Sequence, residues 1–207
     1  MGRQTQISKE DLLSAGVRIV IRDGYSALTV KTLAAEAGCS TQPILWSFGS
    51  MENYRAELPY FALQYLKNKM DIPTNSAMMG FGYVGLAWLD TAIDEPNLLS
   101  YLFSTNLFAN EDCGVNKVLF QQTDDAMAQA IASQLEIDVQ AVNKIMMTLE
   151  LFTLGLMNLL VDGTISITKM QAHKLLQDVA ITQMVGIGVK KEIVASFLNS
   201  AGKGDKQ

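Results

Sequence analysis

The chain has 207 residues, of which 49% are hydrophobic and 18% are charged, with a net charge of −5. This is a globular composition with enough apolar residues for a sizeable core, which excludes a disordered chain. Two cysteines and one histidine exclude a disulfide framework and a four-ligand zinc site. The first residues lack the apolar stretch of a signal peptide, and the most apolar window, 142–161, carries Lys144 and Glu150. We therefore expect a reduced, cytoplasmic protein without a membrane-spanning segment.

The first 70 residues predict three short helices followed by a long one. A hydroxyl side chain precedes each short apolar run, and the expected N-caps are Ser8, Thr29 and Ser40. Glycines that end the same helices stand at Gly24, Gly38 and Gly49. The long helix should run from Met51 to about Met70, with a bend at Pro59. Three short helices with a tight turn between the second and third are typical of a helix-turn-helix.

Beyond this point the chain predicts more apolar helices, separated by breaks rich in Asp, Asn, Gly and Pro. Their expected ranges are 75–93, 96–109, 115–135, 138–161, 168–188 and 191–199. No run of alternating residues is long enough for a strand, so the fold class is all-α. We expect a helix-turn-helix domain over 1–58, a larger helical domain over 59–201 and a polar tail over 202–207.

Nothing in the sequence favours an enzyme, a cofactor or a metal site. The glycines of 80–85 have the spacing G-x-G-x-x-G, but no strand precedes them. Such a segment indicates instead a helix that another helix approaches closely. Asp124 and Asp125 are adjacent on a helix and point about 100° apart, so they cannot form an acid/base pair.

The first domain resembles the tetracycline-repressor (TetR) family over about residues 7–58. The motifs that carry the resemblance are Leu-Thr at 28–29, Leu-Ala at 33–34, Ala-Gly-Cys-Ser at 37–40 and Phe-Gly-Ser-Met-Glu at 48–52. The resemblance implies a dimeric transcriptional regulator that binds double-stranded DNA at a palindromic operator. It also implies a C-terminal domain that binds a small molecule and then releases the DNA, as a repressor would.

The resemblance also implies which residues meet DNA, with the third helix at the base edges in the major groove. The implied DNA-binding residues are Thr29, Lys31, Thr32, Thr41, Gln42, Trp46 and Ser47. Gln42 is suited to adenine, which a glutamine amide can bind through two hydrogen bonds. Two alternatives stay open: Thr29 as a helix cap only, and Trp46 as a packing residue.

The charged residues of the first domain give conflicting indications about DNA binding. Residues 1–58 hold six basic and six acidic side chains, and all four arginines of the chain lie among them. The clustered arginines favour a nucleic-acid face, whereas the zero net charge predicts modest affinity. Leu45 and Met51 replace the tyrosine and lysine that are usual in the family, and both changes remove polar contacts. The alternative function is a ligand- or protein-binding module that has lost DNA binding.

The larger domain is rich in methionine and aromatic residues, which would suit an apolar or aromatic effector. The candidate ligand-binding residues are Tyr65, Trp88, Tyr101, Phe103, Phe120, Met127, Met147, Glu150, Phe152 and Asn158. A wide apolar stripe on the helix at 168–188 consists of Ala172, Leu175, Leu176, Val179, Met184 and Ile187. This stripe predicts a homodimer in which two helices of each subunit, near 142–161 and 168–188, form a four-helix interface.

Overall fold

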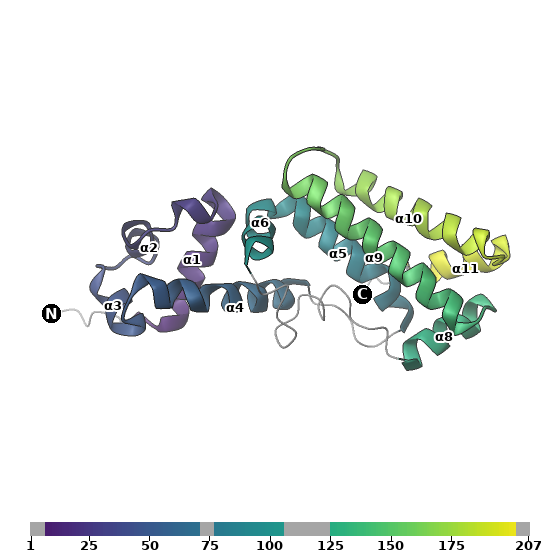
Figure 1. The fold of residues 1–207 in the computed structure, drawn as a ribbon, viewed down its shortest axis with the longest axis horizontal. Helices are drawn as coiled ribbons and strands as arrows, with labels where there is room; N and C mark the ends of the chain where they lie inside the picture. The colour runs from purple at the N-terminus through teal and green to yellow at the C-terminus, as the bar shows by residue number, and fades with distance from the viewer. Residues whose placement is uncertain (1–6, 71–76, 106–124, 202–207) are drawn as a thin grey trace. The chain divides into compact units, whose positions relative to one another are not determined.

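The computed structural model describes residues 7–70, 77–105 and 125–201, together with their side chains outside 77–82, Asp125 and 197–201. Within these ranges the chain forms ten α-helices and one short 3-10 helix, without a strand, which confirms the all-α class (Figure 1). The chain divides into two compact units. Unit 1 comprises residues 1–69 and 95–114, and unit 2 comprises residues 70–94 and 115–207.

Unit 1 contains the helix-turn-helix and one helix from much later in the sequence. Its elements are α1 (Lys9–Asp23), η1 (Tyr25–Ala27), α2 (Val30–Glu36), α3 (Gln42–Phe48), nearly all of α4 (Met51–Met70) and α6 (Pro96–Ser104). Leu12, Val20, Leu33 and Ile44 of α1, α2 and α3 are fully buried and form the centre of this small core. Pro59, where we expected a bend, lies inside α4 and is buried.

The predicted caps of the first two helices are confirmed, and that of the third is wrong. Ser8 forms a capping box with Asp11, and Thr29 forms one with Thr32. The N-cap of α3 is Thr41 rather than Ser40, and its side chain makes no capping hydrogen bond. Thr41 has helical backbone angles, and Pro43 in the first turn offers no N–H, so a side-chain cap would have one donor fewer to satisfy.

Helix α6 belongs to unit 1 because it packs on α1. This compact unit therefore reaches beyond the boundary that we expected at residue 58. The helix ends at Ser104, five residues before the expected end at 109. The hydroxyls of Ser104 and Thr105 donate to the carbonyls of Tyr101 and Leu102, each at 2.7 Å, and such local bonds compete with continued helix.

Unit 2 is a bundle in which α5 and α9 are the central pair. Its elements are α5 (Ala77–Asp94), α8 (Asp125–Leu135), α9 (Val139–Val161), α10 (Lys169–Gly186) and α11 (Lys191–Ala201). Helix α5 packs against the other four. A Cβ at Gly85 would lie 2.9 Å from Leu176 Cδ2 and 3.3 Å from Thr153 Oγ1, which confirms the close helix approach expected for this segment. The first ten residues of the predicted helix 115–135 and the tail 202–207 lie outside the described residues.

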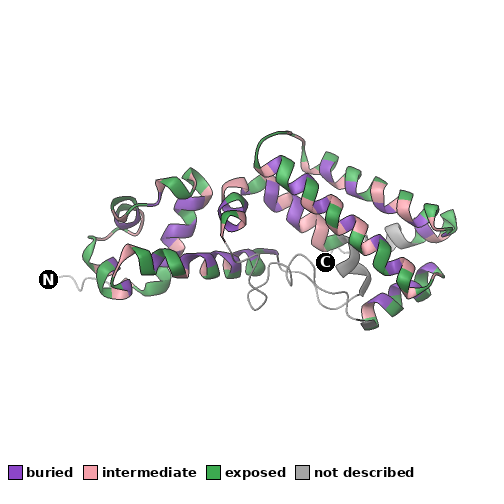
Figure 2. Cartoon of the chain, in the orientation of Figure 1, coloured by how far each residue is buried: buried purple, intermediate pink, exposed green. Residues whose placement is uncertain are grey.

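Helix α9 is apolar on more than one side. Buried and exposed positions alternate along its length (Figure 2). Val142, Ile145 and Met157 are buried, whereas Met147 and Leu151 are each 57% exposed. By length and composition it is the one helix among the described residues that could cross a membrane, with 33% of its most apolar window buried. A helix that buries one apolar face within its own unit and exposes another has a second surface available for packing.

Candidate nucleic-acid interface

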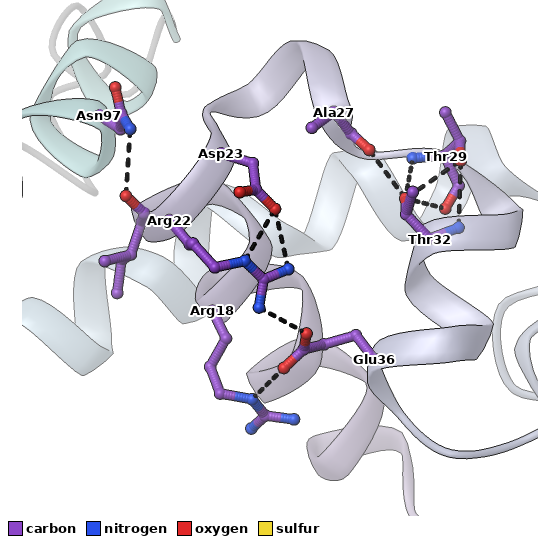
Figure 3. Close-up of polar contacts among 9 residues, drawn as sticks. Arg18, Arg22, Asp23, Ala27, Thr29, Thr32, Glu36 and Asn97 are labelled. Atoms are coloured by element: carbon purple, nitrogen blue, oxygen red, sulfur yellow. Dashed lines mark hydrogen bonds and ion pairs between the residues drawn. The ribbon is translucent and has the colours of Figure 1, made fainter.

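A shared carboxylate fixes the angle between α1 and α2. Arg18 Nε donates to Glu36 Oε1 at 2.8 Å, and Arg22 Nη1 donates to Glu36 Oε2 at 2.9 Å (Figure 3). The hydrogen bonds from Arg18 and Arg22 hold the pKa of Glu36 below its usual value. Arg22 also binds Asp23 at 2.8 Å. The two arginines, one turn apart on α1, therefore serve to hold the first helix of the helix-turn-helix.

The beginning of α2 is fixed by two threonines that we predicted to bind DNA. Thr29 Oγ1 accepts a hydrogen bond from the Thr32 N–H, and Thr32 Oγ1 accepts one from the Thr29 N–H. Thr32 Oγ1 also donates to the Ala27 carbonyl at 2.7 Å, which joins the helix to the preceding turn (Figure 3). Both side chains are exposed, but their hydroxyls already satisfy backbone groups. Capping is thus an observed role for Thr29 and Thr32, and DNA contact stays a prediction.

Helix α3 presents a continuous outward face without a charged side chain. Ile44 and Phe48 point inward and are buried. Gln42 and Trp46, one turn apart, are exposed, and Leu45 lies beside them. Trp46 is 78% exposed and Leu45 is 48% exposed. Since Trp46 is not a packing residue, that alternative is wrong, and its indole is free for a partner. Of the other predicted contacts, Thr41 is exposed and Ser47 is half-buried.

Most cations of the helix-turn-helix are engaged within the protein. Besides Arg18 and Arg22, Arg55 Nη2 donates to the Leu28 carbonyl at 3.2 Å, and Lys9 pairs with Glu57 at 2.7 Å. The three arginines that lie in the described residues are thus held by contacts within the protein, and their contact with nucleic acid stays a prediction. Among the basic side chains of residues 7–58, only Lys31 has no hydrogen bond or ion pair, and it is exposed on α2.

Helix α6 contacts the segment that leads into α2. Asn97 Nδ2 donates to the Ile21 carbonyl near the end of α1 at 3.1 Å (Figure 3). The ring of Tyr101 stacks on that of Tyr25 in η1, with centroids 4.6 Å apart. Tyr101 is buried, which raises the pKa of its hydroxyl, and that hydroxyl has no hydrogen-bond partner. The candidate ligand-binding residue Tyr101 thus lies in the interior of unit 1.

Two other candidate ligand-binding residues also belong to unit 1. The Tyr65 hydroxyl donates to Glu95 Oε1 at 3.1 Å, and Lys69 Nζ binds the same oxygen at 2.6 Å. Burial and the neighbouring Glu95 raise the pKa of Tyr65. Phe103 is half-buried on α6. Tyr65 is therefore part of an ion-pair cluster that ties α4 to the start of α6.

The candidates in unit 2 differ widely in exposure. Trp88 is 1% exposed, and its indole N–H has no hydrogen-bond partner. Glu150 is half-buried on α9, and burial raises the pKa of its carboxyl. Met127 and Phe152 are half-buried as well. Phe120 lies outside the described residues.

Met147 and Asn158 do not fit an internal site within one chain. Met147 is 57% exposed, and Asn158 is an exposed residue whose amide donates to the Leu154 carbonyl of its own helix. Helical spacing placed both residues on α9 correctly, but it does not show which face of the helix turns inward.

Sequence reasoning missed the side chains that connect elements far apart in the chain. Glu36 and Asn97 are examples in unit 1. In unit 2, His173 Nε2 lies 2.7 Å from Asp90 Oδ1, and Lys169 Nζ lies 2.6 Å from Asp94 Oδ2, so both join α10 to α5. No group of three or more metal-ligating side chains occurs in the described part of the chain.

Comparison with known proteins identifies the domain that carries α3. Residues 12–57 match the family model described as bacterial regulatory proteins, tetR family. No curated protein matches the chain. The matched range runs from the first buried turn of α1 through the helix-turn-helix into α4. This N-terminal domain is therefore similar to that of the tetR-family bacterial regulatory proteins, and the similarity supports a DNA-binding transcriptional regulator.

Proposed function

We propose that the chain is a cytoplasmic, homodimeric repressor that leaves a palindromic operator when a small apolar or aromatic effector binds. The observation that carries the DNA-binding part is the outward face of α3, where Gln42 and Trp46 stand free of any intramolecular role. Gln42 and Thr41 would meet base edges, and Lys31 would meet a phosphate. Trp46 and Ser47 would contact the phosphates or sugars of the adjacent DNA strand. Thr29 and Thr32 would chiefly position α2.

The dimer is supported by apolar side chains that unit 2 leaves uncovered. On α9 these are Met147, Leu151 and Leu159, and on α10 they are Met170, Leu175 and Val185, each between 39% and 77% exposed. A twofold axis would bring the two α9–α10 pairs into a four-helix interface and remove this surface from water. Half of the apolar stripe expected on α10, namely Ala172, Leu176 and Met184, is buried within unit 2 instead. The proposed interface is therefore the neighbouring face.

The effector part of the proposal is supported by polar groups in unit 2 that lack partners. The buried Trp88 N–H could donate to an effector, and the half-buried Glu150 carboxylate could bind a cationic one. Met127 and Phe152, two half-buried candidate ligand-binding residues of unit 2, would add apolar surface. An effector that combines an aromatic body with a positive charge suits these groups best.

Selection of random duplexes by the purified protein tests DNA binding and the operator together. The proposal predicts an enriched palindrome whose half-sites lie about 34–36 Å apart, one helical turn of DNA. Gln42→Ala should relax the preference at one base pair of each half-site. If no palindrome is enriched and the selected pool binds no better than random duplex, the alternative of a binding module without DNA activity is correct.

A thermal-shift screen with cationic aromatic dyes and lipophilic metabolites, followed by DNA titration with each hit, tests the effector. A true effector should raise Tm and weaken operator binding, because it must bind the DNA-free state more tightly. Glu150→Gln should reduce the shift caused by cationic hits, and Asn158→Ala on the exposed side of α9 should not. Hits that raise Tm without changing operator affinity would contradict release by an effector.

A further inference from the structure

The outward face of α3 is unusual in its chemistry for a surface that must meet a polyanion. The helix contains no Asp, Glu, Lys or Arg, and its exposed side chains are Gln42, Leu45 and Trp46. Trp46 is the most exposed of the large apolar side chains in the described part of the chain. Two apolar side chains in water beside a single amide indicate a partner surface that is itself partly apolar.

The rest of the helix-turn-helix has few unpaired positive charges that could bind DNA phosphates. Arg18, Arg22 and Arg55 hold α1, α2 and the intervening turn together, and Lys9 is paired with Glu57. Lys31 is left as the unpaired cation within residues 7–58. If phosphate contacts are few, apolar contacts within the groove must contribute more of the binding free energy and more of the discrimination between sequences.

One group in the major groove of B-DNA offers apolar surface, namely the C5 methyl group of thymine. We propose that Leu45 and Trp46 read thymine methyl groups in each half-site, beside the base that Gln42 binds. This inference rests on the proposed function, because it assumes that α3 enters the major groove. On α3, Leu45 and Trp46 follow Gln42 by three and four residues, so the three side chains share one face and can span neighbouring base pairs.

Replacing thymine by uracil tests the proposal, because it removes one methyl group and leaves base pairing unchanged. The operator obtained by selection is synthesised with dU in place of dT, one position at a time in both half-sites. Affinity of the full-length protein is then measured by fluorescence anisotropy at constant salt. Loss of one buried methyl group should weaken binding about fourfold per half-site, and about 16-fold when both half-sites carry dU.

Protein variants then assign the methyl contact to a side chain. Leu45→Ala or Trp46→Ala should abolish the difference between dT and dU at its own position, whereas Gln42→Ala should leave that difference in place. Tyr60→Ala is the matched control, since Tyr60 is a half-exposed aromatic residue on α4 outside the face of α3. Leu45 and Trp46 are exposed, so their truncation should leave the circular dichroism spectrum and Tm unchanged.

The possible outcomes distinguish a failure of methyl reading from a failure of DNA binding itself. A selected half-site without thymine, or an operator whose affinity is insensitive to dU at every position, overturns methyl reading while DNA binding stands. A dU effect that persists in both Leu45→Ala and Trp46→Ala also overturns it. Failure to bind any duplex overturns the proposed function and the methyl contact together, and the exposed Trp46 face would then belong to a protein interface.

Discussion

Unit 1 and unit 2 are both helical, yet their side chains are used differently. In unit 1, charged groups are paired across helices, as Glu36 of α2 is with Arg18 and Arg22 of α1, and hydroxyl groups cap a helix, as Thr29 and Thr32 do at the start of α2. In unit 2, long apolar helices pack on one another, and α9 and α10 leave leucine, methionine and valine side chains exposed. Unit 1 thus pairs most of its described cations internally and leaves one mostly apolar helix face on α3, whereas unit 2 leaves an apolar surface over two helices.

The difference follows from helix length. A helix of seven residues such as α2 buries few apolar side chains and depends on its capping box and on the ion pairs of Glu36 to hold its orientation. A helix of 23 residues such as α9 can bury one face in its own unit and still present another. We therefore expect substitutions in unit 1 to act through specific polar or steric contacts, and those on the outer face of unit 2 to act through association.

The largest expected effect is on association. Leu151→Glu places a charge on the exposed apolar face of α9, and in a symmetric dimer each interface would then contain two such charges. We expect at least about 100-fold weaker dimerisation, equivalent to about 2.7 kcal/mol. Sedimentation velocity at micromolar concentration measures the change. Tyr60→Glu, at a residue of unit 1 with a similar exposed fraction, should leave the dimer intact. A wild-type protein that sediments as a monomer would contradict the dimer itself.

Two helix glycines should differ in how strongly they respond to alanine. A Cβ at Gly16 in unit 1 would overlap the Tyr54 hydroxyl, which is buried and donates to the Leu12 carbonyl at 3.0 Å. At Gly85 in unit 2 the nearest atom is the flexible end of Leu176. Gly16→Ala should lower the free energy of unfolding by about 2 kcal/mol, whereas Gly85→Ala should change it by less than about 1 kcal/mol.

Urea unfolding of both glycine variants provides the measurement. Tyr54→Phe in the Gly16→Ala background removes the clashing oxygen and should recover part of the lost stability. The same change in the wild-type background should lower stability by about 1 kcal/mol, because a buried hydrogen bond is lost. Equal effects of Tyr54→Phe in both backgrounds would show that Gly16 is not constrained by this hydroxyl.

A smaller effect concerns two glutamates whose pKa values shift in opposite directions. Hydrogen bonds from Arg18 and Arg22 lower the pKa of Glu36, so its stabilising contribution is complete above the unfolded value near 4.5 and is lost as pH falls through the lower folded value. Burial raises the pKa of Glu150, so its charged form destabilises the fold at neutral pH, and this penalty disappears as pH falls through the raised value towards 4.5.

Glutamine variants at the two positions should therefore differ in sign at pH 7. Glu36→Gln should be less stable than the wild type by about 1 kcal/mol, since both arginine partners are more than half exposed and the ion pairs are screened. Glu150→Gln should be slightly more stable than the wild type. Both differences should shrink in acid, which thermal unfolding between pH 7 and pH 3.5 can follow. Differences that do not change with pH would exclude ionisation as their cause.

Local signals made much of the fold predictable. Hydroxyl caps before apolar runs placed the starts of α1 and α2, because capping depends on neighbours in sequence. The breaks between apolar runs placed the starts of α9 and α10 within one residue. The family motifs likewise located the helix-turn-helix, which the family model confirms. The start of α3 was misplaced by one residue, because Pro43 changes which N–H groups need a cap.

The candidate site was predictable only in part, because its remaining features depend on contacts between distant residues. The arginines Arg18 and Arg22 look available for DNA in the sequence, and only the packing of α2 on α1 brings Glu36 between them. The candidate ligand-binding residues share a chemical type, but Tyr101 packs in unit 1 and Trp88 in unit 2. The spacing of these residues in the sequence does not show which of the two units each of them belongs to.

The measurement that most directly tests the central account is the fluorescence of Trp46 on the operator. Trp46 and Trp88 are the two tryptophans of the chain, and Trp88→Phe leaves the exposed Trp46 as the sole emitter. If the outward face of α3 enters the major groove, operator DNA should shield Trp46 from acrylamide, a neutral quencher, whereas an equal amount of scrambled duplex should shield it much less. If labelled operator binds, as anisotropy would show, and Trp46 remains as accessible to acrylamide as in the free protein, the outward face of α3 is not the surface that contacts DNA.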